Sequence, residues 1–151
     1  MILIGYDGSP DAKNAIDRAG ELLGDGPVMV LTVWQPIAQT LAASPVGRGP
    51  MAGLGSMEDT DDALRRAADH RAEEGAELAR ARGLDSRSGT CAQERSTAAT
   101  ILNQARTLNA SAIVVGSRGL SGLKSLLLGS VSHAVIQLAD RPVLVVPSPD
   151  G

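Results

Sequence analysis

The sequence predicts an α/β fold: one doubly wound, five-stranded parallel sheet, Rossmann-like, with helices on both faces. Short apolar runs, typical of strands buried on both faces, alternate with segments whose apolar residues recur at helical spacing. The first three segments follow in the order strand, helix, strand, and such a unit requires parallel strands. We expect five strands and four helices in a single domain spanning residues 1–151.

The first strand, helix and second strand have clear boundaries. Residues 2–6 are an apolar run that ends in a glycine-containing turn, as in a buried strand. Ser9 then offers an N-cap oxygen, and Pro10 suits the first helical position. Helical spacing continues to Leu23, Gly24 closes the helix, and residues 28–33 form the second strand.

The segment from residue 35 to about 58 differs from its surroundings. It is rich in Gly, Pro, Ala and Ser and has no clear period, which predicts a long, flexible and often functional connection. The helix expected next, over residues 59–82, starts with acidic residues and ends with Arg80 and Arg82. This charge order complements the helix dipole, so the acidic run needs no active-site explanation.

The second half of the chain continues the alternation. Residues 86–92 are polar and predict a weak strand near a sheet edge, and Cys91 within it is expected to be buried. A helix is expected over residues 96–108 and a fourth strand over residues 112–115. The last helix begins after a glycine-rich segment, and Pro142 and Pro147 bracket the fifth strand.

Composition excludes several classes of function. With 14 basic and 17 acidic residues and no basic block, the net charge of −3 favours neither nucleic acid nor an acidic membrane as a partner. Tyr6 and Trp34 are the only aromatic residues, which leaves few platforms for base stacking. No apolar run approaches the roughly 20 residues of a membrane helix. The N-terminus lacks signal-peptide features, so we expect a cytoplasmic protein.

The glycine-rich segment between the fourth strand and the last helix has the features of a phosphate-binding loop. It is not a P-loop, because Leu123 rather than glycine precedes Lys124. The GxGxxG dinucleotide fingerprint is missing after the first strand, and the GxSxG nucleophile elbow is absent. What remains is the spacing Gly116-x2-Gly119-x9-Gly129-Ser130.

This spacing, the opening GYDGSP and the closing DRPVLVVP together resemble the universal stress protein family. The branch in question binds ATP through the motif G-2x-G-9x-G-[S/T], and the resemblance covers nearly the whole chain. It implies the strand order 3-2-1-4-5. In such a sheet, ligands bind beyond the carboxyl ends of the strands where the order reverses, here between strands 1 and 4.

The resemblance also implies roles for individual residues. Gly5 and Asp7 would line the nucleoside side, the Val33 backbone would meet the adenine, and Gly116 would approach the ribose. The phosphates would lie near the start of the last helix, whose dipole favours anions. The implied ATP site consists of Gly5, Asp7, Val33, Gly116, Arg118, Gly119, Gly122, Gly129, Ser130, Val131 and Ser132.

Several of these residues have structural alternatives. Asp7 could close a turn with Gly8 or cap the first helix, and the glycines could serve tight turns only. Ser130 could be a plain N-cap, compatible with phosphate binding. Arg118 could bind a phosphate or could be a solvated charge in the loop, and the sequence favours neither role. We assign neither histidine a role and predict no catalytic residue and no metal ligand.

The resemblance implies a nucleotide-gated stress-response regulator that binds ATP with Mg²⁺ and forms a homodimer through residues 142–147. ATP turnover is expected to be weak or absent. A slow ATPase or nucleotidyl-transferring enzyme on the same fold is one alternative. A nucleotide-free module that binds unidentified protein partners is another, and cyclic AMP is an alternative ligand.

Overall fold

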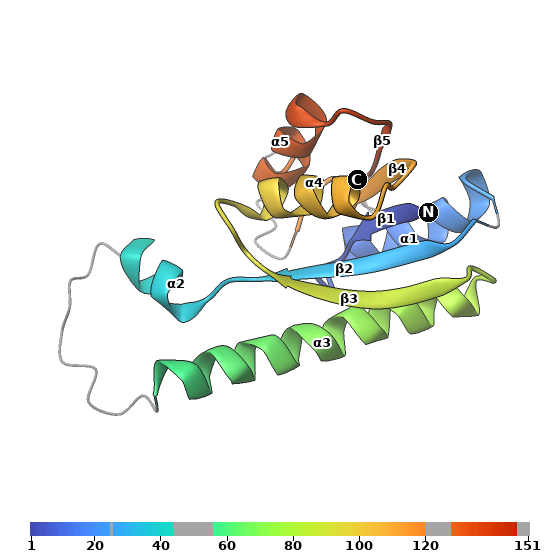
Figure 1. The fold of residues 1–151 in the computed structure, drawn as a ribbon. Helices are drawn as coiled ribbons and strands as arrows, with labels where there is room; N and C mark the ends of the chain where they lie inside the picture. Colours follow the sequence, from blue (N-terminus) through green and yellow to red (C-terminus); the bar gives the residue numbers. More distant parts are fainter. Residues whose placement is uncertain (25, 44–55, 120–127, 148–151) are drawn as a thin grey trace.

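The computed structural model describes residues 1–24, 26–43, 56–119 and 128–147. Five parallel strands form one sheet in the order β3-β2-β1-β4-β5 (Figure 1). The predicted fold class and strand order are therefore confirmed. The elements are β1 (Ile2–Gly5), α1 (Pro10–Leu22), β2 (Val28–Trp34), α2 (Ile37–Ala43), α3 (Met57–Ala81), β3 (Ser86–Ala92), α4 (Thr97–Thr107), β4 (Ala112–Gly116), α5 (Ser130–Leu138) and β5 (Val143–Val146).

The turn after β1 starts α1 as the sequence predicts. The backbone N–H of Ala12 donates to Ser9 Oγ at 3.2 Å, and Pro10 is the first helical residue. Gly24 follows the helix with φ +73°, a conformation that favours glycine. These local signals place the N-terminus of α1 directly beyond the carboxyl end of β1.

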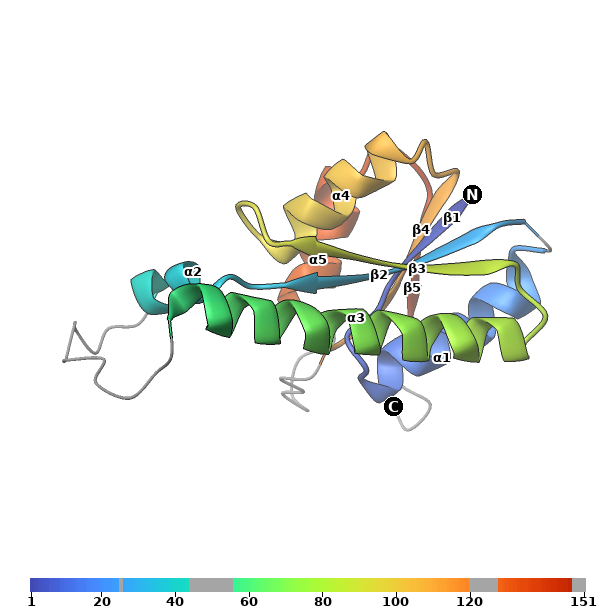
Figure 2. The same cartoon turned by 60° about the horizontal axis from the view of Figure 1, so that its bottom comes forward.

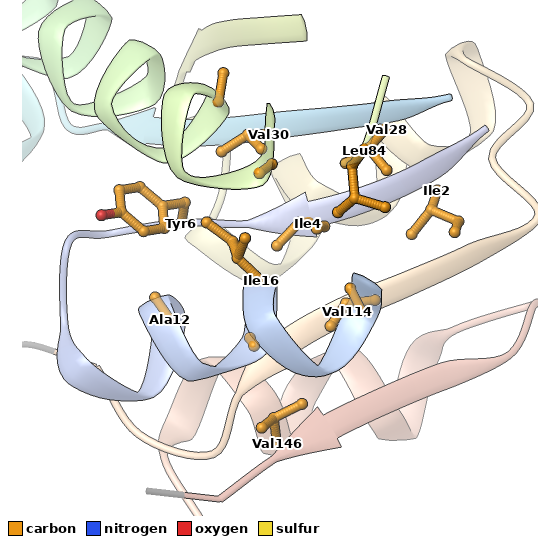
Figure 3. Close-up of a cluster of buried hydrophobic side chains, with 14 residues drawn as sticks. Ile2, Ile4, Tyr6, Ala12, Ile16, Val28, Val30, Leu84, Val114 and Val146 are labelled. Atoms are coloured by element: carbon orange, nitrogen blue, oxygen red, sulfur yellow. The ribbon is translucent and has the colours of Figure 1, made fainter. Parts of the chain in front are cut away.

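Two apolar cores lie on opposite faces of the sheet. On β1, Ile2 and Ile4 pack with α1 and α3, whereas Leu3 between them packs with the core formed by α4 and α5. Figure 3 shows the first core, with Ile4 and Ile16 facing each other between the sheet and α1. Because both faces of β1 are covered, its run is apolar throughout, as in other parallel sheets.

Helix α3 lies against the first face at very short range. A Cβ placed on Gly75 would lie 2.8 Å from Val30 Cγ1 and 2.9 Å from Tyr6 Cδ1, so only glycine fits this position. The helix starts two residues before its predicted first residue because Ser56 caps it, with Asp59 N donating to Ser56 Oγ at 3.1 Å. Its N-terminal part extends beyond the sheet (Figure 2).

The segment predicted as an irregular connection contains a helix, α2. Its first backbone N–H, at Ile37, donates to Asp61 Oδ1 on α3 at 2.7 Å, and Gln39 Nε2 donates to the Gln93 carbonyl at 2.8 Å. The described residues thus hold five helices, not the four expected. Residues 44–55 of the same segment lie outside the described residues.

The two edges of the sheet differ in polarity. β3 is a polar edge strand, as predicted, and β5 is an apolar edge strand of valine and leucine. Cys91 on β3 is half-buried rather than fully buried, and burial raises the pKa of its thiol. Within the described ranges, no helix is both long and apolar enough to span a bilayer.

Candidate functional site

A cleft of about 540 Å³ opens at the carboxyl edge of the sheet, between the ends of β1 and β4. The chain leaves β1 toward α1 on one face and leaves β4 toward α5 on the other, which makes this the switch point of the sheet. The described lining residues are Gly5, Tyr6, Asp7, Ala12, Val33, Gln35, Arg71, Thr97, Ile101, Val115, Gly116, Arg118, Gly119, Gly129, Ser130, Val131 and Ser132.

The structure brings every described residue of the predicted site to this one cleft. Gly122 lies outside the described residues. We call the part of the cleft lined by Val33, Gln35 and Thr97 the β2 end. The part lined by Gly119, Gly129 and Ser130 is the β4–α5 end, and β1 separates the two.

The backbone of Val33 faces the cleft because β2 is longer than β1. The last residue of β1, Gly5, pairs with Leu31, and Tyr6 N donates to the Leu31 carbonyl at 2.9 Å. On the opposite side, Gln93 N donates to the Trp34 carbonyl at 2.7 Å. Since polar groups alternate sides along a strand, the N–H and C=O of Val33 point past the end of β1. The β2 end therefore presents one donor and one acceptor in fixed positions.

Asp7 has two roles: it holds the turn before α1, and it lines the cleft. Ser9 N donates to Asp7 Oδ1 at 2.9 Å, and Gly8 has φ +83°, so this side chain does shape the turn before α1. Its second oxygen faces the β4–α5 end, where a Cβ placed on Gly119 would lie 2.6 Å from Asp7 Oδ2. A side chain at position 119 would therefore displace Asp7 or the loop.

Gly116 and Gly129 serve close packing. A Cβ on Gly116 would lie 2.7 Å from Asp11 Cβ and 2.8 Å from the Asp11 backbone carbon, so the end of β4 touches α1 directly. A Cβ on Gly129 would lie 3.2 Å from the Ser117 carbonyl oxygen. Gly129 N also donates to that oxygen at 2.7 Å, which leaves this N–H engaged within the protein.

Helix α5 begins at Ser130, the residue that was suggested as its cap. Gly129, not Ser130, occupies the N-cap position, and no side chain there accepts a backbone hydrogen bond. The first N–H groups of a helix have no partner within it, so those of Ser130 and Val131 stand at the cleft with the positive end of the helix dipole. Ser132 Oγ donates to the Gly116 carbonyl at 2.7 Å, which makes Ser132 a group that positions α5 on β4.

The role of Asp11 was not predicted, because this residue resembles an ordinary acidic residue in a first helical turn. Its side chain is buried, and its Oδ2 accepts hydrogen bonds from Ser117 Oγ and Arg118 N, both at 2.9 Å. Arg118 Nε lies 3.6 Å from the same oxygen. Arg118 is thus partly buried, and it both lines the cleft and lies beside the Asp11 carboxylate. Only the contact between α1 and β4, more than 100 residues apart, reveals this.

Other lining residues also come from distant segments. Arg71 on α3 brings a second cation to the cleft, next to Gly8, where a Cβ would lie 3.5 Å from Arg71 Nε. Tyr6 donates from its hydroxyl to Glu74 Oε1 at 3.0 Å, and burial raises the pKa of the phenol. The tyrosine therefore contributes a neutral ring to the wall.

The described lining carries little that could perform chemistry. Asp7 is the one carboxylate among the described lining residues, and neither His70 nor His133 lines the cleft. No group of three or more His, Cys, Asp or Glu side chains in the described ranges is placed to hold a metal ion. The arrangement offers anion-binding backbone groups and fixed polar groups, which suits binding.

The chain matches the Universal stress protein family over residues 1–147. A universal stress protein of Bacillus subtilis is 63% identical over 46 residues, 30% of this chain and 31% of that relative. One from Mycolicibacterium smegmatis is 30% identical over 99% of this chain and 48% of its own length. One from Thermus aquaticus is 31% identical over 96% of both chains. The chain thus spans less than half of the first two relatives.

Solved structures share the fold at lower identity. A universal stress protein in complex with cAMP matches with a TM-score of 0.63, 23% identity and coverage of 97% of this chain and 95% of that one. The universal stress protein from Archaeoglobus fulgidus in complex with dAMP matches with a TM-score of 0.63 and 21% identity, and the match covers 96% of this chain and 95% of that one. A universal stress protein family protein from Arabidopsis thaliana with AMP bound matches with a TM-score of 0.63 and 17% identity, and the match covers 97% of this chain and 90% of that one. By sequence and by fold, this chain belongs to the universal stress protein family.

Proposed function

We propose that the chain binds an adenine nucleotide, ATP with Mg²⁺, in the cleft between β1 and β4 and acts as a nucleotide-gated regulator in the cytoplasm. The observation that carries this proposal is the pairing of two features across β1. The backbone N–H and C=O of Val33 face one end of the cleft, and the uncapped N-terminus of α5 faces the other. Family members crystallised with AMP, dAMP and cAMP support it.

The β2 end suits a nucleobase. Adjacent donor and acceptor groups on the Val33 backbone match the alternating donors and acceptors on the edge of an adenine ring. Ile101 and Val115 add apolar surface, which a flat base needs on its faces. The cleft volume of about 540 Å³ lies within the range of small-molecule sites, about 300–1,000 Å³.

The β4–α5 end suits the phosphates. The N–H groups of Ser130 and Val131 and the α5 dipole attract an anion, and Arg118 lies nearby. Asp7 alone supplies a carboxylate among the described lining residues, whereas Mg²⁺ in nucleotide sites takes one or two carboxylates plus phosphate oxygens. Magnesium would therefore arrive with the nucleotide and use Asp7 at most. With no general base assigned, we propose binding without efficient hydrolysis.

Calorimetry with Mg-ATP, ADP, AMP and cAMP on nucleotide-stripped protein tests this proposal. Gly119→Ala should weaken ATP binding about tenfold or more, because its Cβ would fall 2.6 Å from Asp7 Oδ2. Gly26→Ala is the matched control, since nothing lies within 4 Å of its Cβ position. No binding at millimolar ATP, or equal affinity in both variants, would overturn the ATP site. Steady phosphate release would favour the ATPase alternative.

We also propose that the chain forms a homodimer through residues 142–147. β5 is an edge strand whose residues Val143, Leu144 and Val145 are half-buried, and a partner strand would cover this apolar edge. Val145→Lys should convert the dimer to a monomer in light scattering. Arg87→Lys on the opposite edge should leave the dimer intact.

A further inference from the structure

A buried carboxylate stands behind the β4–α5 end of the cleft. Asp11 is 5% exposed, and all three of its contacts given above involve one oxygen, Oδ2. Two donors, Ser117 Oγ and Arg118 N, bind it at 2.9 Å. The third group, Arg118 Nε, lies at 3.6 Å, beyond a normal hydrogen bond but within ion-pair range.

The contact depends on the absence of a side chain at Gly116. The Cβ that this residue lacks would lie 2.7 Å from Asp11 Cβ, so the first turn of α1 reaches the end of β4 only because of the glycine. The pair is also shielded from water, with side-chain exposures of 24% for Arg118 and 7% for Asp11. Charges in such a place interact more strongly than surface pairs.

The positive charge of Arg118 can therefore interact with two groups, a ligand in the cleft and the Asp11 carboxylate. Arg118 lines the cleft, where the phosphates of a bound nucleotide would lie, and it faces Asp11 from the protein side. Asp11 itself does not line the cleft, so it cannot bind a ligand there directly. Its described contacts connect Asp11 to the cleft through the backbone N–H and the guanidinium of Arg118.

We propose that Asp11 sets the preference of the cleft for ligand charge, by orienting the Arg118 guanidinium and offsetting its positive charge. This inference rests on the proposed nucleotide site. An anionic ligand must share Arg118 with Asp11. Each added phosphate therefore adds less binding free energy than it would beside an unpaired arginine. Asp11 is a positioning residue, and Arg118 is the group through which it acts.

The charge and the geometry of Asp11 can be separated by Asp11→Asn. Asparagine keeps an oxygen that accepts from Ser117 Oγ and Arg118 N, but it removes the charge opposite the guanidinium. We expect Asp11→Asn to bind Mg-ATP on the order of tenfold more tightly, AMP to gain less and adenosine to be unchanged. The gain should shrink as salt concentration rises.

Arg118→Gln tests the other partner. It should weaken ATP binding on the order of tenfold and leave adenosine unaffected. In the double variant Asp11→Asn/Arg118→Gln, the gain from Asp11→Asn should disappear, because the group that carried it is absent. Asp17→Asn is the matched control. Asp17 lies on the same helix and pairs with Arg82 Nε at 2.8 Å, but neither residue lines the cleft.

Calorimetry on the wild type and these four variants, with Mg-ATP, AMP, adenosine and inorganic tripolyphosphate, decides the matter. Equal loss of ATP and adenosine affinity in Asp11→Asn would reduce Asp11 to a fold-stabilising residue and overturn the inference. A gain that persists in the double variant would overturn it as well. Failure of the wild type to bind any adenosine compound would refute the proposed function. In that case, tighter tripolyphosphate binding by Asp11→Asn supports the inference, and no tripolyphosphate binding by any variant overturns it.

Discussion

At the β2 end of the cleft, the polar groups belong to the backbone of a strand, whereas at the β4–α5 end they are ordered by side chains and glycine contacts. Val33 is held by the ladder between β2 and β3, which continues to the bond between Gln93 N and the Trp34 carbonyl. The other end depends on Gly116, Asp11 and Ser132, each acting through one or two atoms. The β4–α5 end should therefore be the more sensitive of the two to single substitutions.

The largest effect is expected from Gly116→Ala. Its Cβ would lie 2.8 Å from the Asp11 backbone carbon and 3.0 Å from Ala12 N, and backbone atoms of a capped helix cannot move aside. We expect a loss of about 3 kcal/mol in the free energy of unfolding, measured by urea denaturation. Gly26→Ala, in open space, should stay within about 0.5 kcal/mol. Equal stability of the two variants would show that α1 and β4 separate easily.

A matched pair of hydroxyl deletions compares the two ends directly. Thr32→Val removes the bond from Thr32 Oγ1 to the Tyr6 carbonyl, 2.9 Å, near the β2 end. Ser132→Ala removes the bond from Ser132 Oγ to the Gly116 carbonyl, 2.7 Å, at the β4–α5 end. Both hydroxyls are buried, so each change should cost about 1–2 kcal/mol in urea denaturation.

The Thr32→Val and Ser132→Ala variants should differ in nucleotide affinity, although their losses of stability should be similar. Ser132→Ala should weaken ATP more than adenosine, because it loosens the phosphate end, whereas Thr32→Val should weaken both equally. Calorimetry with the two ligands provides the measurement. The opposite ranking would mean that the base and phosphates lie the other way round in the cleft.

The smallest effect concerns Tyr6 and is absent at neutral pH. Burial and the hydrogen bond to Glu74 raise the pKa of its phenol above the ordinary value of 10.0. Above pH 10, the unfolded chain loses this proton while the folded chain keeps it, so stability should fall as pH rises further. Tyr6 is the only tyrosine, so tyrosinate absorbance reports it alone. Tyrosinate signal that appears near pH 10 without unfolding would contradict a raised pKa.

Local signals in the sequence were sufficient for most of the fold. Apolar runs, helical spacing and the capping residue Ser9 placed the strands and four of the helices, because their cause lies within a few residues. Helix α2 was missed because its stabilising contacts come from Asp61 and Gln93, which are distant in sequence. Its seven residues are too short to be stable alone.

The same distinction applies to the candidate site. Glycines at strand ends can be read from spacing, since each marks a place where the chain turns or touches another segment. Asp11 and Arg71 could not be predicted, because each looks like an ordinary charged helix residue until the topology brings Asp11 against Arg118 and Arg71 to the cleft. The packing of α1 on β4 and of α3 on the turn after β1 decides both.

The greater length of β2 relative to β1 has a consequence for mutational studies. Because Val33 presents its main chain to the cleft, replacement by another β-branched residue would leave the donor and acceptor unchanged. A scan of side chains would thus record position 33 as silent, even if a base docks there as we propose. Only an amide-to-ester exchange in the chain itself, which deletes the donor without altering the side chain, would expose its contribution.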